Sequence, residues 1–353
     1  MPILSKVTKM ISRILDRIKN LPLILGIRIE LLHYTSFGHP FYQHELACWE
    51  KKKWRLIVFI MPNNYPHLSV VRFLQKDFIV CKAPLAAIRI LQFCGIVKQN
   101  YKINPDFNYS ENLAIDNGSA ALAEYQKIRP RYDIIICDRP PATEDCTQKY
   151  PVSSRSFTIS EVGFAEEVAE EYRMTTCSNT FQSANSDCAP PFGADLTITK
   201  IASSRIYFGT NTGPYVCAQS LRKDCFLFNV IPFLGTHSYH KVTDCVLPAI
   251  IAYRNNGQLV DIATILRNGI YLLDDQELKR KGLIAIRHDW ELVKICWREY
   301  LSRLLCDAII PTASQRSFQN LIQRYTSFGS PVIVPNSYIA WLTRKNLLPS
   351  TFT

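Results

Sequence analysis

The feature that most constrains the fold is an alternation of short apolar runs with segments of helical pattern, repeated along most of the chain. Runs of four to eight apolar residues closed by polar turns are typical of buried strands. The expected strands are 27–34, 54–61, 77–81, 132–137, 205–208 and 225–230. The expected helices are 41–51, 70–75, 84–93, 113–126, 160–173, 195–202, 214–221, 258–267, 274–281, 289–305 and 315–325. Strands that alternate with helices predict an α/β protein built on doubly wound parallel sheets.

The length of the chain sets the number of domains. With 353 residues, of which 47% are hydrophobic, it can bury two cores more readily than one. We therefore predict two Rossmann-like domains, an N-terminal one over 25–128 and a C-terminal one over 129–330. A basic helix over 1–24 precedes them, and a tail over 331–353 follows.

The first residues have an amphipathic pattern. Apolar residues recur at helical spacing at Ile3, Val7, Ile11, Ile14 and Ile18. Basic residues lie between them at Lys6, Lys9, Arg13, Arg17 and Lys19. Such a helix can lie on an anionic membrane surface, or it can pack on its own domain with a solvated basic face. No apolar run is long enough for a membrane span. We expect a cytoplasmic protein that can lie peripherally on the inner face of a membrane.

The net charge of +11 indicates an anionic partner: nucleic acid, an anionic membrane or a phosphorylated ligand. Nucleic acid is disfavoured, because the basic residues do not alternate with stacking aromatics and no nucleic-acid motif is present. The twelve cysteines form no Cys-x-x-Cys pair and show no metal-ligand spacing with histidine. We therefore expect a reducing compartment. No Asp-x-Asp metal-binding pair occurs at a strand end, so we expect no metal, and we also expect no cofactor.

The strongest candidate for chemistry is the segment Gly209-Thr210-Asn211-Thr212-Gly213, between the expected strand 205–208 and the expected helix 214–221. A strand that leads through a tight loop into a helix directs backbone N–H groups and the positive end of the helix dipole at one point. Glycines allow a phosphate to approach, and the polar side chains add donors. The alternative is an ordinary turn in which glycine only relieves a steric clash.

The same segment carries a family resemblance. The stretch from Asp195 to Pro232, with the loop above and a strand ending in Asn229-Val-Ile-Pro, resembles the C-terminal half of a bacterial family of GT-B glycosyltransferases related to fucosyltransferase- and heptosyltransferase-like enzymes. Thr35-Ser-Phe-Gly-His39 is similar to that family's first-strand loop, and 268–280 to its closing region. The resemblance implies two Rossmann-like domains facing a cleft. It also implies metal-independent transfer of a hexosyl or deoxyhexosyl group from a nucleotide-sugar to a glycan, lipid-linked or protein acceptor of cell-surface glycan biosynthesis.

The resemblance also assigns roles. Gly38 belongs to the acceptor-side loop, and His39 is the candidate general base, since histidine titrates near neutral pH. Arg139 would grip the donor diphosphate, together with Gly209, Thr210, Asn211, Thr212, Gly213 and Asn229. His39 could instead only hydrogen-bond, and Arg139 could pair with Asp138 or Asp145. The family has a His-x-Arg context where this chain reads Cys137-Asp138-Arg139. A degenerate, non-catalytic GT-B module, acting as a scaffold or binding a membrane surface, is therefore the alternative function.

Overall fold

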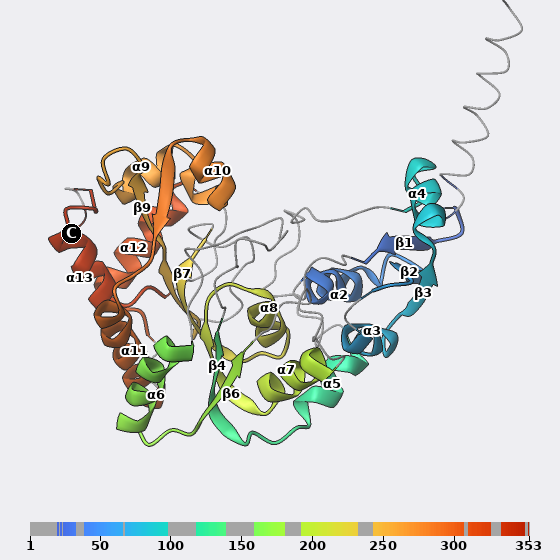
Figure 1. The fold of residues 1–353 in the computed structure, drawn as a ribbon, viewed down its shortest axis with the longest axis horizontal. Helices are drawn as coiled ribbons and strands as arrows, with labels where there is room; N and C mark the ends of the chain where they lie inside the picture. Colours follow the sequence, from blue (N-terminus) through green and yellow to red (C-terminus); the bar gives the residue numbers. More distant parts are fainter. Residues whose placement is uncertain are drawn as a thin grey trace, which may run out of the picture. The chain divides into compact units, whose positions relative to one another are not determined.

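The computed structural model describes residues 20, 22, 24–32, 39–65, 68–97, 118–138, 159–180, 192–231, 243–306, 310–325, 333–349 and 352. The chain divides into two compact units, and each is described by itself. The first comprises 1–107 with 112–127, and the second comprises 108–111 with 128–353. The basic helix expected over 1–24 falls almost entirely outside the described residues. The α/β class is confirmed, because each unit has a parallel sheet flanked by helices (Figure 1).

The first unit contains a three-stranded parallel sheet in the order β1-β2-β3. Its strands are β1 (Ile27–Leu31), β2 (Leu56–Pro62) and β3 (Ile79–Ala83), and its helices are α2 (His39–Glu50), α3 (Leu68–Gln75), α4 (Leu85–Phe93) and α5 (Ala120–Gln126). Successive residues of β2 face opposite sides of the sheet. Phe59 packs on Phe78 near the aromatic side chains of α2 and α3, whereas Ile60 joins Ile88 of α4 in a separate core cluster. Helices therefore cover both faces.

The second unit contains a five-stranded parallel sheet in the order β5-β4-β6-β7-β8. The strands are β4 (Tyr132–Asp138), β5 (Thr176–Thr180), β6 (Ser204–Gly209), β7 (Asp224–Val230) and β8 (Cys245–Pro248). The chain starts in the interior at β4, adds β5 on one side, and then crosses back to build β6, β7 and β8 on the other. This is the 2-1-3-4-5 order of a doubly wound sheet, with its reversal between β4 and β6.

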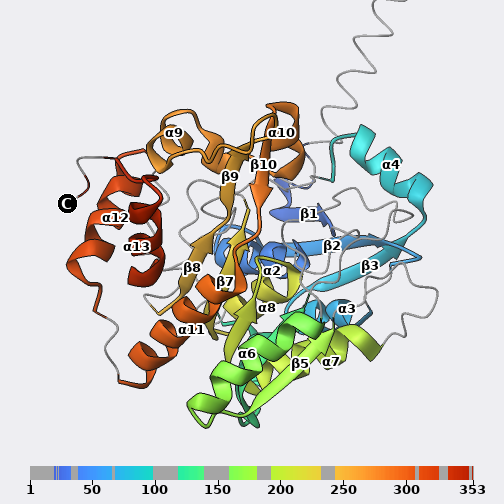
Figure 2. The same ribbon diagram turned by 60° about the vertical axis from the view of Figure 1, so that its left-hand side comes forward.

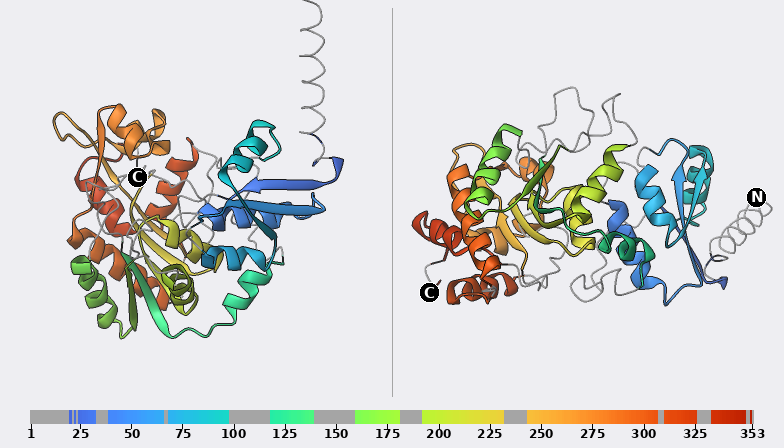
Figure 3. Two further views of the ribbon diagram at one scale, coloured as in Figure 1. Left: turned by 45° about the vertical axis from the view of Figure 1, so that its right-hand side comes forward. Right: turned by 90° about the horizontal axis from the view of Figure 1, so that it is seen from below.

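Helices cover the two faces of this sheet (Figures 2 and 3). On one face Trp297 of α11 (Trp290–Leu305) packs against Phe208 and Phe226, next to α6 (Ile159–Glu171). On the other face Tyr215 of α8 (Gly213–Ser220) packs against Tyr207, next to α7 (Phe192–Ala202). Because Tyr207 and Phe208 are consecutive in β6, the alternation of a strand separates the two layers.

The rest of the second unit completes its core. β9 (Ile250–Tyr253) pairs antiparallel with β10 (Leu283–Ile286), and between them lie α9 (Ile262–Arg267), the short 3-10 helix η1 (Ile270–Leu272) and α10 (Asp275–Arg280). α12 (Ala313–Gln323) and α13 (Asn336–Arg344) pack beside each other, and α13 also packs against α11 (Figure 2). Residues 333–349, which we assigned to a tail, thus contain a packed helix.

Side-chain caps explain where several helices begin. Asp261 accepts from the Thr264 amide, so α9 starts at Ile262 and not at the expected residue 258. Thr312 forms a capping box with Gln315, so α12 starts before the expected residue 315. A cap satisfies amides that the first helical turn leaves without partners.

Candidate functional site

The predicted loop lies at the reversal of strand order in the second unit. β6 ends at Gly209 and α8 begins at Gly213. In the sheet, Gly209 is the register partner of Cys137 in β4 on one side and of Leu227 in β7 on the other. In open α/β sheets, ligands bind outside the carboxyl ends of the strands, where the strand order reverses. The strand order therefore supports this loop as a ligand site, independently of its sequence.

The loop turns tightly around the carbonyl of Thr210. That oxygen accepts from the Thr212 amide at 2.8 Å and from the Tyr207 hydroxyl at 3.3 Å. The side chain of Thr210 is different: the residue is 0% exposed, and its Oγ1 has no hydrogen-bond partner among the described residues. A buried hydroxyl without a partner costs free energy, so natural proteins rarely keep one without a reason such as an ordered water or a ligand. Thr210 Oγ1 is therefore the loop side-chain group whose hydrogen-bonding capacity the described residues leave unused.

The amino end of α8 adds backbone donors. Gly213 is the first residue of the helix, and its N–H has no partner within the described part of the chain. Pro214 has no N–H, and the Tyr215 amide donates to the Thr212 carbonyl at 3.1 Å. Since residues 214–220 are all buried, the positive end of the helix dipole is weakly screened. The loop thus offers one hydroxyl, one amide and a favourable field for an anion.

Steric crowding in the folded sheet explains why position 209 is a glycine. A Cβ at this position would lie 2.8 Å from the Tyr207 hydroxyl and 3.1 Å from the Cys137 carbonyl oxygen. Both distances are shorter than ordinary carbon–oxygen contacts, so the glycine is required by Tyr207 and by the neighbouring strand. The approach of a phosphate is not needed to explain it.

Asn211 holds the loop against the end of β7. Its Nδ2 donates to the Ile231 carbonyl at 2.6 Å, and its Oδ1 accepts from the Ile231 amide at 3.4 Å. The side-chain amide of Asn211 therefore acts as a clamp between the ends of β6 and β7. Thr212 also faces inward, with its Oγ1 3.4 Å from both the Thr210 carbonyl oxygen and the Tyr207 hydroxyl. These two residues shape the site, and Thr210 and Gly213 carry its spare donors.

Asn229 is bound to a histidine that our sequence analysis did not consider. Its φ of 50° is left-handed, and the pairing of β7 with β8 is irregular between Leu227 and Val230. Asn229 Oδ1 accepts from the His288 amide at 2.8 Å, and the Asn229 amide donates to His288 Nδ1 at 3.3 Å. Burial lowers the pKa of His288 to about 4, with a weaker opposing effect from the Pro248 carbonyl. His288 is therefore neutral at pH 7, and the pair closes the end of β7.

The remaining predicted residues are only partly described. Gly38 and Arg139 lie outside the described residues, although β4 ends at Asp138, immediately before Arg139. His39 is the first residue of α2, and its side chain is also outside the described part. The structure thus brings the whole segment 209–213 together at one sheet edge and joins it, through Asn211, to the strand that contains Asn229.

One group in the first unit has the residue types of a metal site. The ligand atoms of His44, Cys48 and Asp77 lie within 4.8 Å of one another, and within the described ranges no other such group occurs. Asp77 already accepts from His44 Nε2 at 2.8 Å, from the Ser119 hydroxyl at 2.6 Å and from the Ala120 amide at 2.7 Å. His44 Nδ1 is buried without a hydrogen-bond partner, whereas metal-binding histidines usually have that nitrogen bonded. The contacts fit a buried polar network that ties α2 to α5.

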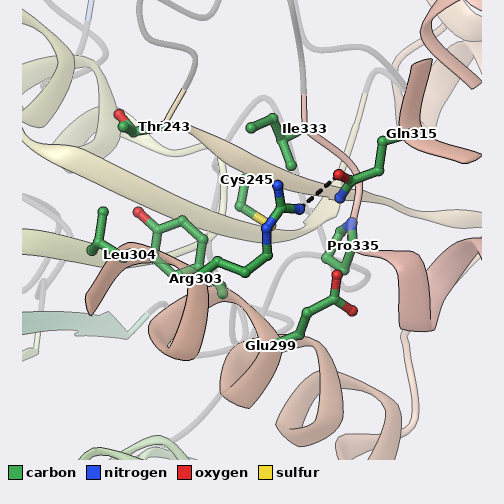
Figure 4. A pocket seen from close by; sticks show the side chains of 9 residues that line it. Thr243, Cys245, Glu299, Arg303, Leu304, Gln315, Ile333 and Pro335 are labelled. Atoms are coloured by element: carbon green, nitrogen blue, oxygen red, sulfur yellow. Dashed lines mark hydrogen bonds between the residues drawn. The ribbon is translucent and has the colours of Figure 1, made fainter. Parts of the chain in front are cut away.

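A small pocket, partly open to solvent, lies at the amino edge of the second sheet, beside the start of β8 (Figure 4). Its charged groups are already paired. Arg303 donates to Gln315 Oε1 at 2.6 Å and to the Ile310 carbonyl at 2.7 Å, and the Glu299 carboxylate accepts from the amides of residues 336 and 337 at the start of α13. The one unpartnered polar group that lines it within the described chain is the Tyr300 hydroxyl. This arrangement does not suit a phosphorylated ligand.

Comparisons with known proteins add no assignment. No family model, curated protein or solved structure matched the chain. In the described part of the chain, no helix combines the length and the apolar character needed to cross a bilayer. The functional interpretation therefore depends on the residues of the site itself.

Proposed function

We propose that the chain is a glycosyltransferase that binds a nucleotide-sugar at the 209–213 loop and transfers the sugar to an acceptor of cell-surface glycan or glycoconjugate biosynthesis. In this proposal the second unit binds the donor and the first unit binds a glycan, lipid-linked or protein acceptor, in a GT-B arrangement. The observation that carries it is the buried Thr210 Oγ1, which has no hydrogen-bond partner among the described residues and lies in the loop that leads to the Gly213 amide, where the strand order reverses.

The diphosphate of the donor is the group that this loop suits best. A phosphate oxygen can accept from Thr210 Oγ1 and from the Gly213 N–H, and the helix dipole of α8 favours its charge. Arg139 directly follows β4, the neighbour of β6, and a guanidinium matches phosphate in a bidentate way. These groups would also stabilise the charge that develops on the leaving diphosphate.

The acceptor side of the proposal rests on His39. It is the first residue of α2, the helix that follows β1 in the chain, and an imidazole can take the proton of an acceptor hydroxyl near neutral pH. Gly38 precedes it in the acceptor-side loop. The roles of His39 and Arg139 are tested by the functional effects of replacing each residue.

A thermal-shift screen of UDP-, GDP-, ADP- and CMP-sugars tests donor binding. At a ligand concentration of 100 times the dissociation constant, binding adds about 2.7 kcal/mol to the free energy of unfolding. For a domain of this size, each kcal/mol raises the melting temperature by about 2–4 °C. We expect one nucleotide class to stabilise the protein, and Arg139→Ala to reduce that shift. His39→Ala should keep the shift and lose transfer. A protein that no nucleotide-sugar stabilises would contradict the proposal.

Activity assays of variants distinguish the degenerate GT-B module. That alternative predicts that His39→Ala and Arg139→Ala leave the biological activity intact, whereas deletion of residues 1–20 abolishes it. The commitment of Asn211 and Asn229 to backbone contacts is the observation that favours it, since these two amides contribute to shape instead of to ligand contact.

A further inference from the structure

The helix α4 is apolar on both of its sides. Its inner side is formed by Ile88, which is 3% exposed, and by Leu91, which packs against the same core cluster. Its outer side carries Leu85, Ile90 and Phe93, which are 47%, 62% and 85% exposed. At 100° per residue, the outer side chains occupy one continuous arc of about 140°. Large apolar side chains that gather on one exposed arc mark an interaction site, and the described residues leave this arc of α4 exposed.

The charge of the segment around α4 indicates what kind of surface covers the outer arc of the helix. From Phe78 to Val97 the chain contains two basic residues, Lys82 and Arg89, and no acidic residue. Both basic residues are exposed, and Arg89 lies within the outer arc of α4. Large apolar side chains flanked by basic groups match the boundary of an anionic bilayer, where acyl chains lie beneath negative headgroups.

We propose that the outer arc of α4, formed by Leu85, Ile90 and Phe93 with Arg89, inserts into the interface of an anionic lipid bilayer. Leu85, Ile90 and Phe93 enter the acyl boundary, while Arg89 and Lys82 remain at the headgroup level, as long basic side chains do. The helix lies in the plane of the interface and does not cross it, because nine residues are far too short for a span. A nucleotide-sugar site is not required for this binding, so the two proposals fail separately.

Co-sedimentation of the full chain with vesicles tests the inference. The vesicles contain phosphatidylcholine with about one third phosphatidylglycerol, and vesicles of phosphatidylcholine alone are the reference. The wild-type chain should bind the anionic vesicles much more strongly, since basic groups near the surface add to the apolar contribution. We expect I90Q/F93Q to weaken the partition coefficient about tenfold or more, because two of the largest inserted side chains become polar. R89E should weaken binding to anionic vesicles and leave the weak binding to phosphatidylcholine almost unchanged.

The matched control is L305Q/I310Q. These residues belong to the second unit and are similarly exposed, at 53% and 78%, but no membrane role is assigned to them. This control should bind as the wild type does, and both double variants should keep the wild-type melting temperature, because the changed side chains are exposed. The inference is overturned if the wild type ignores anionic vesicles, or if I90Q/F93Q binds as tightly as the control. It is also overturned if light scattering shows a dimer that I90Q/F93Q converts to a monomer, because a second copy would then cover α4.

Discussion

Replacing Thr210 by valine tests whether the Thr210 hydroxyl stabilises the fold or is kept for a ligand. Valine keeps the shape of threonine and removes Oγ1, which is buried and has no hydrogen-bond partner among the described residues. Removing an unpartnered buried hydroxyl should relieve about 1–3 kcal/mol of desolvation cost. The ligand-free variant should therefore be more stable than the wild type, by about 2–4 °C in Tm for each kcal/mol.

The same substitution should weaken donor binding. A hydrogen bond to a charged phosphate oxygen contributes about 1.5–3 kcal/mol, so the nucleotide-sugar should bind Thr210→Val roughly 10- to 150-fold more weakly. Calorimetric titration and urea denaturation of the same preparation measure both effects. A gain in stability together with a loss in affinity is the signature of a group preorganised for a ligand.

The matched control is Thr243→Val, at the opposite edge of the same sheet. Thr243 Oγ1 donates to Asp224 Oδ1 at 2.7 Å, so this hydroxyl has a partner. Its removal should destabilise the protein by about 1–2 kcal/mol and leave nucleotide affinity unchanged. The reasoning is refuted if Thr210→Val destabilises the protein as the control does, or if it binds the nucleotide-sugar with wild-type affinity.

Four further predictions test the second unit around the loop and at the opposite edge of the sheet. Gly209→Ala should cost about 1–3 kcal/mol in urea denaturation, and Tyr207→Phe should recover part of that loss, because the 2.8 Å contact is to the Tyr207 hydroxyl. Asn229→Ala should lower the free energy of unfolding by about 2–4 kcal/mol, because the hydrogen bond to the His288 amide is lost. Asn229→Gly should lower it by about 1 kcal/mol less, since glycine tolerates a φ of 50°. Equal losses in the two variants would refute the strain argument. The pKa of His288 is lowered to about 4 in the folded chain, so between pH 7 and pH 4 the unfolded chain binds a proton that the folded chain does not. The free energy of unfolding should therefore fall by about 3 kcal/mol from pH 7 to pH 4. His288→Gln should lose this pH dependence. Glu299→Ala should cost about 2–4 kcal/mol, as the cap of α13 is lost, without changing nucleotide affinity; a weakened affinity would place the ligand at the amino-edge pocket instead.

The interior of the second sheet could be predicted from sequence because it is strongly apolar. Residues 134–137 of β4 are at most 1% exposed, and a run of that kind predicts a buried strand without any knowledge of its neighbours. The strand β5 is absent from the strands expected from the sequence. Its sequence Thr-Cys-Ser-Asn-Thr lacks an apolar run, because β5 pairs only with β4 in the described sheet and needs little apolar cover. β8 and the β9–β10 pair were also missed, since strands of four residues are too short for periodicity to identify.

The position of the loop in the fold could be predicted from the sequence, but the roles of its individual residues could not. The order strand, glycine-bounded loop and helix located segment 209–213 correctly at a carboxyl edge. The reason for Gly209 depends on where the Tyr207 ring packs, and the role of Asn229 depends on His288, which is 59 residues away in the chain. Such contacts come from tertiary packing and have no local sequence signal. A histidine directly before the capping residue Asp289 was the nearest available hint, and it does not indicate a partner.

Hydrogen–deuterium exchange with the best-binding nucleotide-sugar tests the central claim most directly, because it reports where the ligand contacts the chain. The account predicts protection of the peptide that covers residues 205–216, where the Gly213 amide lacks a partner in the described structure, and no such protection in Thr210→Val at the same ligand concentration. Protection confined to the peptides that line the amino-edge pocket, around Arg303 and Gln315, would contradict the account, as would a bound nucleotide-sugar that leaves 205–216 unchanged.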